Sequence, residues 1–197
     1  MTPPQEPPVP ASAKAIEKRI NTALKQLICK AYPSCTDEPF RKKYDAIVAL
    51  FAQYQEQVLA KYPLPLTCGA HCGVCCYHWP EDTYSFEVRF IADYLKKQRP
   101  KELPNIIKTL TDDCICIGLI KKAEKEKCKD PVYKKALGNA DPYDLVLSSF
   151  YQFKRSCPLL STNGSCSIYP IRPFTCRVYI SFSPKEYCRP SRIAARF

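Results

Sequence analysis

The stretch "CGAHCGVCC", residues 68–76, concentrates four cysteines and a histidine in a short segment of the chain. The cysteines are Cys68, Cys72, Cys75 and Cys76, and the histidine is His71. Cysteines at this density indicate a metal site, part of a disulfide framework or a reactive thiol. A papain-like catalyst would need a histidine remote from this segment, and the other histidine, His78, lies three residues after Cys75. Thiol catalysis is therefore the least favoured of the three.

A second set of cysteines lies far along the chain, in "CPLLSTNGSCSIYPIRPFTCRVY", residues 157–179. It consists of Cys157, Cys166 and Cys176, and Cys188 follows it. Glycine, asparagine and proline between these cysteines favour an irregular backbone that can turn thiolates inward. We therefore expect all eight cysteines to be candidate ligands of a metal site that ties the middle of the chain to its end. Closing so long a loop contributes folding free energy.

The redox state of the cysteines depends on the compartment. The opening residues, "MTPPQEPPVPASAKAIEKRI", lack the apolar core of a secretory signal. The longest apolar stretch, "AIVALFA" at 46–52, is far shorter than the roughly 20 residues that cross a membrane. We expect a soluble, cytoplasmic protein with no membrane partner, in which thiols stay reduced and metal binding is favoured over disulfides.

The chain is basic, with a formal net charge of +11 and a pI near 9.0. This charge suits nucleic acid, an acidic protein or a membrane surface. The lysines are spread along predicted helix faces, which is typical of a solvated basic surface. We expect an unidentified protein partner or substrate, with nucleic acid as the weaker alternative.

Hydrophobic periodicity predicts a mostly α fold: a single helical domain with irregular cysteine-rich loops forming a metal site. The domain spans residues 12–197, after a disordered, proline-rich tail at 1–11. Helices are predicted over 12–32, 37–61, 85–97, 104–128, 130–137 with Gly138 past its end, and 141–153. The last two begin with Asp-Pro, which suits a helix cap followed by a first turn. The only predicted strand is a short one, "CRVYISF", at 176–182.

The cysteine motifs resemble those of a known family. "CxxxCxxCC", a glutamate about ten residues later, and "CPLL" with "GSCSIYPIRPFTCR" are similar to the YkgJ-type cysteine-cluster proteins over about residues 68–180. This resemblance implies a zinc- or iron-chelating domain in which seven of the cysteines are candidate ligands: Cys68, Cys72, Cys75, Cys76, Cys157, Cys166 and Cys176. It also marks Glu87, Tyr169, Arg172 and Arg177 as motif residues. Flagellin lysine methylases contain a similar cysteine module, which implies by analogy an iron–sulfur cluster and protein methylation.

The residues leave the metal open, since four thiolates suit tetrahedral zinc and a four-iron cluster equally. Eight cysteines exceed the need of one site, so either two sites exist or some cysteines lie outside the ligand set. Arg172 and Arg177 favour iron–sulfur, because guanidinium groups can donate hydrogen bonds to sulfur from outside that set. The alternative for both arginines is an ion pair with a carboxylate such as Glu87.

Two functions therefore stay open. The first is a metal-binding cysteine-cluster protein, iron–sulfur in type, with a redox or protein-modifying role. The second is a non-catalytic, structural zinc module whose basic surface binds nucleic acid or an acidic partner. The sequence does not decide whether the protein is an enzyme. His71 is expected to face solvent, and five cysteines are expected to be buried as small apolar residues: Cys29, Cys35, Cys114, Cys116 and Cys128.

Overall fold

The computed structural model describes residues 7–32, 34, 37–69, 71–80, 82–138 and 141–188. The chain divides into two compact units, residues 1–66 and 67–197. Helices dominate both, and the described residues form no strand beyond an isolated bridge. The predicted mostly α fold class is thus confirmed. The predicted boundaries of one domain over 12–197 stay a prediction, and most of the predicted tail lies outside the described residues.

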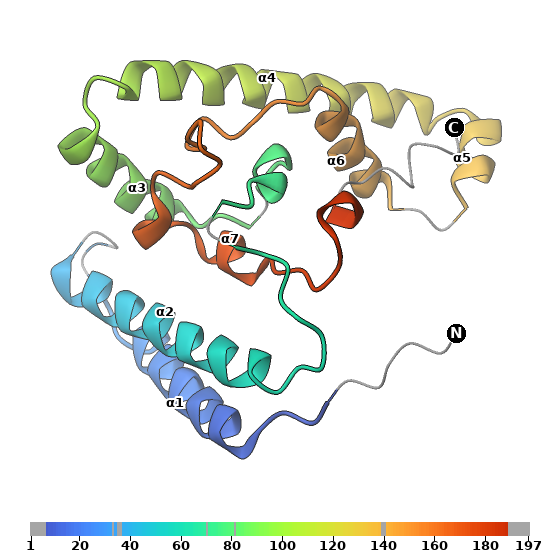
Figure 1. The fold of residues 1–197 in the computed structure, drawn as a ribbon. Helices are drawn as coiled ribbons and strands as arrows, with labels where there is room; N and C mark the ends of the chain where they lie inside the picture. The colour runs from blue at the N-terminus through green and yellow to red at the C-terminus, as the bar shows by residue number, and fades with distance from the viewer. Residues whose placement is uncertain are drawn as a thin grey trace. The chain divides into compact units, whose positions relative to one another are not determined.

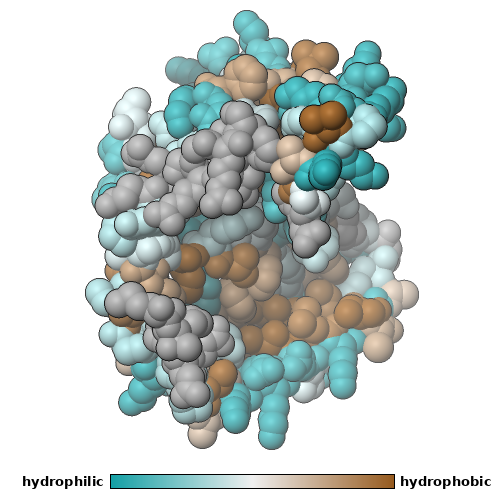
Figure 2. All heavy atoms as spheres, turned by 90° about the vertical axis from the view of Figure 1, so that its right-hand side faces the viewer, coloured by the Kyte–Doolittle hydropathy of each residue, from teal (hydrophilic) through white to brown (hydrophobic). Residues whose placement is uncertain are grey.

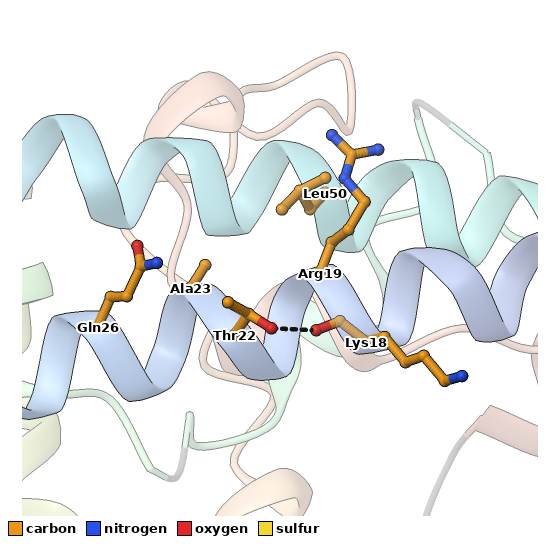
Figure 3. A pocket seen from close by; sticks show the side chains of 6 residues that line it. All are labelled: Lys18, Arg19, Thr22, Ala23, Gln26 and Leu50. Carbon is orange, nitrogen blue, oxygen red and sulfur yellow. Dashed lines mark hydrogen bonds between the residues drawn. The ribbon is translucent and has the colours of Figure 1, made fainter.

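The first unit is a pair of packed helices, α1 (Ala11–Ile28) and α2 (Glu38–Leu59). The Ser12 hydroxyl donates a hydrogen bond to the Gln57 side chain over 2.9 Å, so the start of α1 lies beside the end of α2. Figure 3 shows an open groove between these helices. Its lining residues are Lys18, Arg19, Thr22, Ala23, Gln26 and Leu50. The lining contains no cysteine or histidine, so the groove offers no sulfur or imidazole ligand.

The second unit is built on three helices, α3 (Ser85–Gln98), α4 (Leu103–Lys127) and α6 (Pro142–Gln152). α4 packs against α6, which lies beside one part of the longer helix (Figure 1). Four buried residues from these two helices form one hydrophobic cluster: Ile117, Ile120, Val146 and Phe150. A second cluster joins α3 and the start of α4 to the loop before α7 through Leu95, Ile106 and Ile168. These two clusters are the core on which the cysteine-bearing segments rest.

Local sequence signals fix several helix ends. α5 (Pro131–Leu137) and α6 both begin with Asp-Pro, as predicted. The Asp130 and Asp141 carboxylates each accept a hydrogen bond over 2.8 Å from the backbone two residues later, which is how an N-cap satisfies an otherwise unpaired N–H group. Gly138 follows α5 with a positive φ of 59°, a conformation that favours glycine.

The cysteine-bearing part of the chain contains only short helical turns: η1 (Val74–Tyr77), η2 (Tyr169–Ile171), α7 (Phe174–Val178) and η3 (Lys185–Cys188). The predicted strand at 176–182 is wrong, because α7 occupies its first three residues and the remainder is irregular. The β-branched and aromatic residues of this segment favour a strand. A hydrogen bond from the Phe174 N–H to the Glu87 carboxylate, over 2.7 Å, instead supports the start of a helix.

Both hydrophilic and hydrophobic side chains reach the face shown in Figure 2. Exposed apolar residues include Val132, Phe153 and Tyr187. Exposed apolar residues that occur singly are ordinary on soluble domains and mark no interface by themselves. Among the described residues, no helix has the length and apolar character needed to cross a membrane.

Candidate metal centre

The two cysteine sets meet through their backbones. The N–H of Cys157 donates a hydrogen bond to the carbonyl of Cys76 over 2.7 Å. Two glycines allow this close approach. A Cβ at Gly164 would lie 2.9 Å from the carbonyl oxygen of His71, and one at Gly73 would lie 3.0 Å from the Leu160 side chain. The structure thus places the two predicted sets side by side, although they lie far apart in the sequence.

The second set is shaped by a tight hairpin-like loop. The N–H of Ser161 bonds to the carbonyl of Ser165 over 2.8 Å, and the N–H of Ser167 bonds to that of Leu159 over 2.8 Å. An isolated antiparallel bridge joins Leu160 to Cys166 between them. Cys166 also packs against the cluster formed by Leu95, Ile106 and Ile168. The loop therefore returns Cys166 toward Cys157 and holds it on the core.

The C-terminal segment closes over the first set. Thr67 donates through its N–H and its hydroxyl to the carbonyl of Ser181, at 2.9 and 2.8 Å, and its hydroxyl also lies 2.6 Å from the carbonyl of Ser183. The N–H of Ser181 in turn donates to the sulfur of Cys68 over 3.1 Å. Nε2 of His78 lies 3.0 Å from the carbonyl of Cys188. These contacts bring Cys188 beside the first set.

The pKa values of several thiols depend on neighbouring cysteines, within each set and between the sets. Burial raises the pKa of Cys68, and Cys72, Cys188 and Cys75 raise it further by charge repulsion. Burial also raises the pKa of Cys176 to about 12, and its repulsive neighbours are Cys157, Cys75 and Cys166. The pKa of Cys157 is raised by burial first and then by Cys166, Asp113 and Cys75. Without a cation, this arrangement favours neutral thiols.

Cys75 and Cys76 behave differently from the other thiols. The Cys76 thiol donates a hydrogen bond to the sulfur of Cys75, and this bond, with a smaller contribution from Arg172, lowers the pKa of Cys75 to about 6. The same hydrogen bond raises the pKa of Cys76 because it stabilises the protonated form. Cys75 is exposed, whereas the other seven candidate ligands are half-buried. Cys75 is thus an exposed residue whose thiol has a lowered pKa.

The two motif arginines occupy different positions. The Arg172 guanidinium stacks 4.3 Å from the centre of the Tyr169 ring, and its buried Nε has no hydrogen-bond partner among the described residues. It lowers the pKa of both Cys75 and Cys176 and therefore lies within electrostatic reach of the sulfurs. Arg177 instead donates to the carbonyls of Arg172 and Pro170, at 3.1 and 2.8 Å. Arg177 thus supports the loop that presents Arg172.

The donor set fits a thiophilic metal. Thiolates are ligands for zinc and for iron–sulfur clusters, and a bound cation offsets the repulsion that otherwise keeps crowded thiols protonated. Within the described ranges, however, no three Cys, His, Asp or Glu side chains already converge at ligand spacing. The arrangement therefore brings the sulfurs into one neighbourhood without a finished coordination shell.

The other predicted cysteine and histidine positions are less uniform. His71 is exposed, as expected for a side chain that faces solvent. Cys116 and Cys128 are half-buried, but Cys29 and Cys114 are exposed, so the prediction that they are buried is wrong. Cys29 follows the end of α1, and Cys114 lies on the outward face of the unbroken helix α4. Cys35 lies outside the described residues.

Sequence reasoning missed the residues that hold the loops together, namely Thr67, Ser181, Gly73 and Gly164. Their backbone contacts are long-range and leave little trace in a motif. One signal was present, because glycine is scarce in this chain, with five in all, and Gly73 and Gly164 each lie between two cysteines. A glycine inside a metal loop often marks a close backbone approach.

We expect Gly164→Ala to lower the free energy of unfolding by about 1–3 kcal/mol, because a Cβ would clash with the His71 carbonyl at a φ of +81°. Urea unfolding of the metal-free protein measures this. Gly69→Ala, in the first loop, meets nothing within 4 Å and should change stability by no more than about 0.5 kcal/mol. Gly138→Ala has an unfavourable φ but open space, and should fall between the two. Equal effects of Gly164→Ala and Gly138→Ala would show that the loops do not meet here.

A comparison with protein families places much of the chain in a known family. The CxxCxxCC family, described as "Putative zinc- or iron-chelating domain", matches residues 67–192, the greater part of the second compact unit. Neither the curated proteins nor the solved structures contain a match. All eight predicted ligands lie within the matched residues, and the match begins where the second unit begins. The chain therefore belongs to the CxxCxxCC family of zinc- or iron-chelating domains.

Proposed function

We propose that the eight clustered cysteines bind an iron–sulfur centre and that the protein has a redox or protein-modifying role in the cytoplasm. The observation that carries this proposal is the meeting of two distant cysteine sets at Cys76 and Cys157, with thiols on both sides that interact electrostatically. Such a centre would supply one-electron transfer when bound. The protein supplies the sulfur ligands, the loop geometry and the neighbouring positive charge.

Metal binding must draw the thiols closer together, because they are not yet at ligand spacing. Binding that also orders its own ligands converts binding free energy into folding free energy. The helices already have two hydrophobic clusters, so we expect the metal to order the cysteine loops on an existing core. The loss of metal should therefore disturb the loops more than the helices.

Iron–sulfur is preferred over zinc because of Arg172. Its guanidinium is within electrostatic reach of Cys75 and Cys176, and a positive charge beside sulfur stabilises the more negative, reduced state of a cluster. A structural zinc site has no redox state that such a charge could tune. The alternative is a zinc module, which the family description equally allows. Its basic surface for nucleic acid or an acidic partner is supported only by the chain's charge of +11.

Anaerobic purification followed by a visible spectrum, an iron assay and an acid-labile sulfide assay tests the proposal. A coloured protein that contains iron and sulfide in similar amounts supports it. A colourless protein loaded with zinc supports the alternative, and the iron–sulfur assignment would then be abandoned.

Arg172→Leu should lower the reduction potential while most of the metal stays bound, because the reduced cluster loses a neighbouring positive charge. Effects of residues outside the ligand set on metal affinity are usually within about 10- to 100-fold. Arg89→Leu is the matched control, since Arg89 pairs with Asp93 at 3.3 Å on the surface of α3. Redox titration monitored by the visible spectrum measures both. An unchanged potential in Arg172→Leu would assign this arginine to packing against Tyr169 alone.

A further inference from the structure

Glu87 is a buried carboxylate that joins two separate parts of the second unit. It lies in the first turn of α3 and is only 2 % exposed. One carboxylate oxygen accepts a hydrogen bond from the N–H of Tyr84 over 3.0 Å, and the other accepts one from the N–H of Phe174 over 2.7 Å. The first bond closes the N-terminus of α3, and the second reaches a residue 87 positions further along the chain.

Phe174, which donates the second hydrogen bond, lies close in the chain to a candidate ligand. Phe174 is the first residue of α7, and Cys176 follows two residues later within the same short helix. The intervening Thr175 is buried. Cys176 interacts electrostatically with Cys157, Cys75 and Cys166. A shift of the start of α7 would therefore move this thiol relative to three other candidate ligands.

The near end of the bridge is firmly anchored. α3 contributes two buried side chains, Phe90 and Leu95, and Leu95 belongs to the hydrophobic cluster with Ile106 and Ile168. The hydrogen bond from the Phe174 N–H to Glu87 thus holds the start of α7 against α3. A short helix of five residues cannot maintain its own position, because isolated helices of this length are unstable in water.

A carboxylate suits this bridge better than an amide does. Both N–H groups need an acceptor, and an ionised carboxylate offers one oxygen to each. Glutamine would offer one oxygen and would direct its NH₂ group at the other N–H, which leaves a buried donor without an acceptor. The requirement for two acceptors explains why a carboxylate occupies a position at which burial of a polar group is unfavourable.

We propose that Glu87 is a positioning residue for the metal centre: by bonding the N–H of Phe174 it fixes α7 on α3 and so holds Cys176 among the other cysteines. The inference rests on the proposed metal-binding function. It assigns to Glu87 a role distinct from that of an ion-pair partner of the arginines. The carboxylate acts on the ligand Cys176 through the backbone of α7.

Glu87→Gln tests this, with Glu124→Gln as the matched control. Glu124 is also buried, and its carboxylate accepts hydrogen bonds from the Tyr133 hydroxyl over 2.8 Å and from Lys127 over 2.9 Å. It lies near the end of α4, and its partners are outside the cysteine loops. Each variant replaces one buried carboxylate that accepts at least two hydrogen bonds. They therefore separate a general loss of stability from a loss at the centre.

Two measurements are compared. The first is metal retention in competition with a chelator, for variants adjusted to the same folded fraction by circular dichroism. Glu87→Gln should retain metal about 10- to 100-fold less well than the wild type, and Glu124→Gln should stay within about twofold. The second is the rate at which iodoacetamide alkylates Cys176 in metal-free, reduced protein, followed by peptide mass spectrometry. Glu87→Gln should speed this reaction, and Glu124→Gln should not.

The outcomes distinguish the two claims. If the wild-type protein holds no metal, the proposed function fails, and the alkylation rate of metal-free Cys176 still tests the positioning role. If Glu87→Gln matches Glu124→Gln in both measurements, Glu87 stabilises the fold only and the inference is overturned. If Glu87→Gln does not fold, Glu87→Asp replaces it. Its shorter side chain keeps the charge but cannot span both N–H groups, and the same two comparisons apply.

Discussion

Cys176→Ser is expected to lose most of its metal and to be less stable than the wild type by about 3 kcal/mol or more. Cys176 lies in the middle of α7, and its thiol interacts with Cys157, Cys75 and Cys166 from both cysteine sets. Serine is a poor replacement for a thiolate ligand of zinc or iron. Loss of a metal is also among the largest effects that a single substitution has on folding. Cys75→Ser, in the first set, should act in the same direction.

Metal analysis and urea unfolding of the same samples measure both effects. Cys114→Ser is the control, because Cys114 is exposed on α4 and outside the cluster. It should retain wild-type metal content and stability. Full metal occupancy in either Cys75→Ser or Cys176→Ser would contradict a centre shared between the two sets. A loss in Cys114→Ser as well would point to a general sensitivity of the fold to substitution.

Removing the metal from the wild-type protein should have the second large effect. Chelation under reducing conditions at pH 7 is expected to lower the free energy of unfolding by on the order of 5 kcal/mol. The expected loss is smaller than the roughly 10–16 kcal/mol that structural zinc contributes in small peptides. The reason is that the helices here have a hydrophobic core that does not depend on the metal. Urea unfolding of loaded and stripped protein gives the difference. Identical unfolding curves would contradict any contribution of metal to the fold.

The metal-free protein should also respond to alkaline pH. Burial raises the pKa of Cys68 and Cys157, and it raises that of Cys176 from an ordinary 9.0 to about 12. As pH rises, the unfolded chain loses these protons before the folded protein does. The stability that the neutral thiols contribute is therefore present below about pH 9 and is lost between about pH 9 and pH 12. In the loaded protein, thiolates are already bound, and acid releases the metal instead.

Local signals in the sequence predicted the helices well. The Asp-Pro starts at Asp130 and Asp141 and the glycine after α5 specify helix ends through contacts within a few residues. The apolar periodicity of α6 likewise reports a face that the same helix buries. Such features depend on nearby residues and can therefore be read from the chain without knowledge of its tertiary contacts.

The arrangement of the cysteine loops could be predicted only in part. Spacing selected eight cysteines as candidate ligands, and the structure brings the two sets together. The bonds from Phe174 to Glu87 and from Thr67 to Ser181, however, join distant segments. The first of these supports a helix where β propensity favoured a strand. The exposure of Cys114 follows from which face of α4 meets α6. Its own neighbours in the sequence do not encode that choice, since apolar residues occur on both faces.

The most direct test of a metal centre in this chain is the amount of metal per folded protein. Wild-type protein is purified anaerobically without added metal, desalted, and analysed for iron and zinc by plasma mass spectrometry together with its protein concentration. We predict at least about one tightly bound thiophilic metal ion per chain, retained through gel filtration and lost in Cys176→Ser. A folded, monodisperse protein that contains neither iron nor zinc, and that does not take up either metal on anaerobic reconstitution, would contradict the assignment.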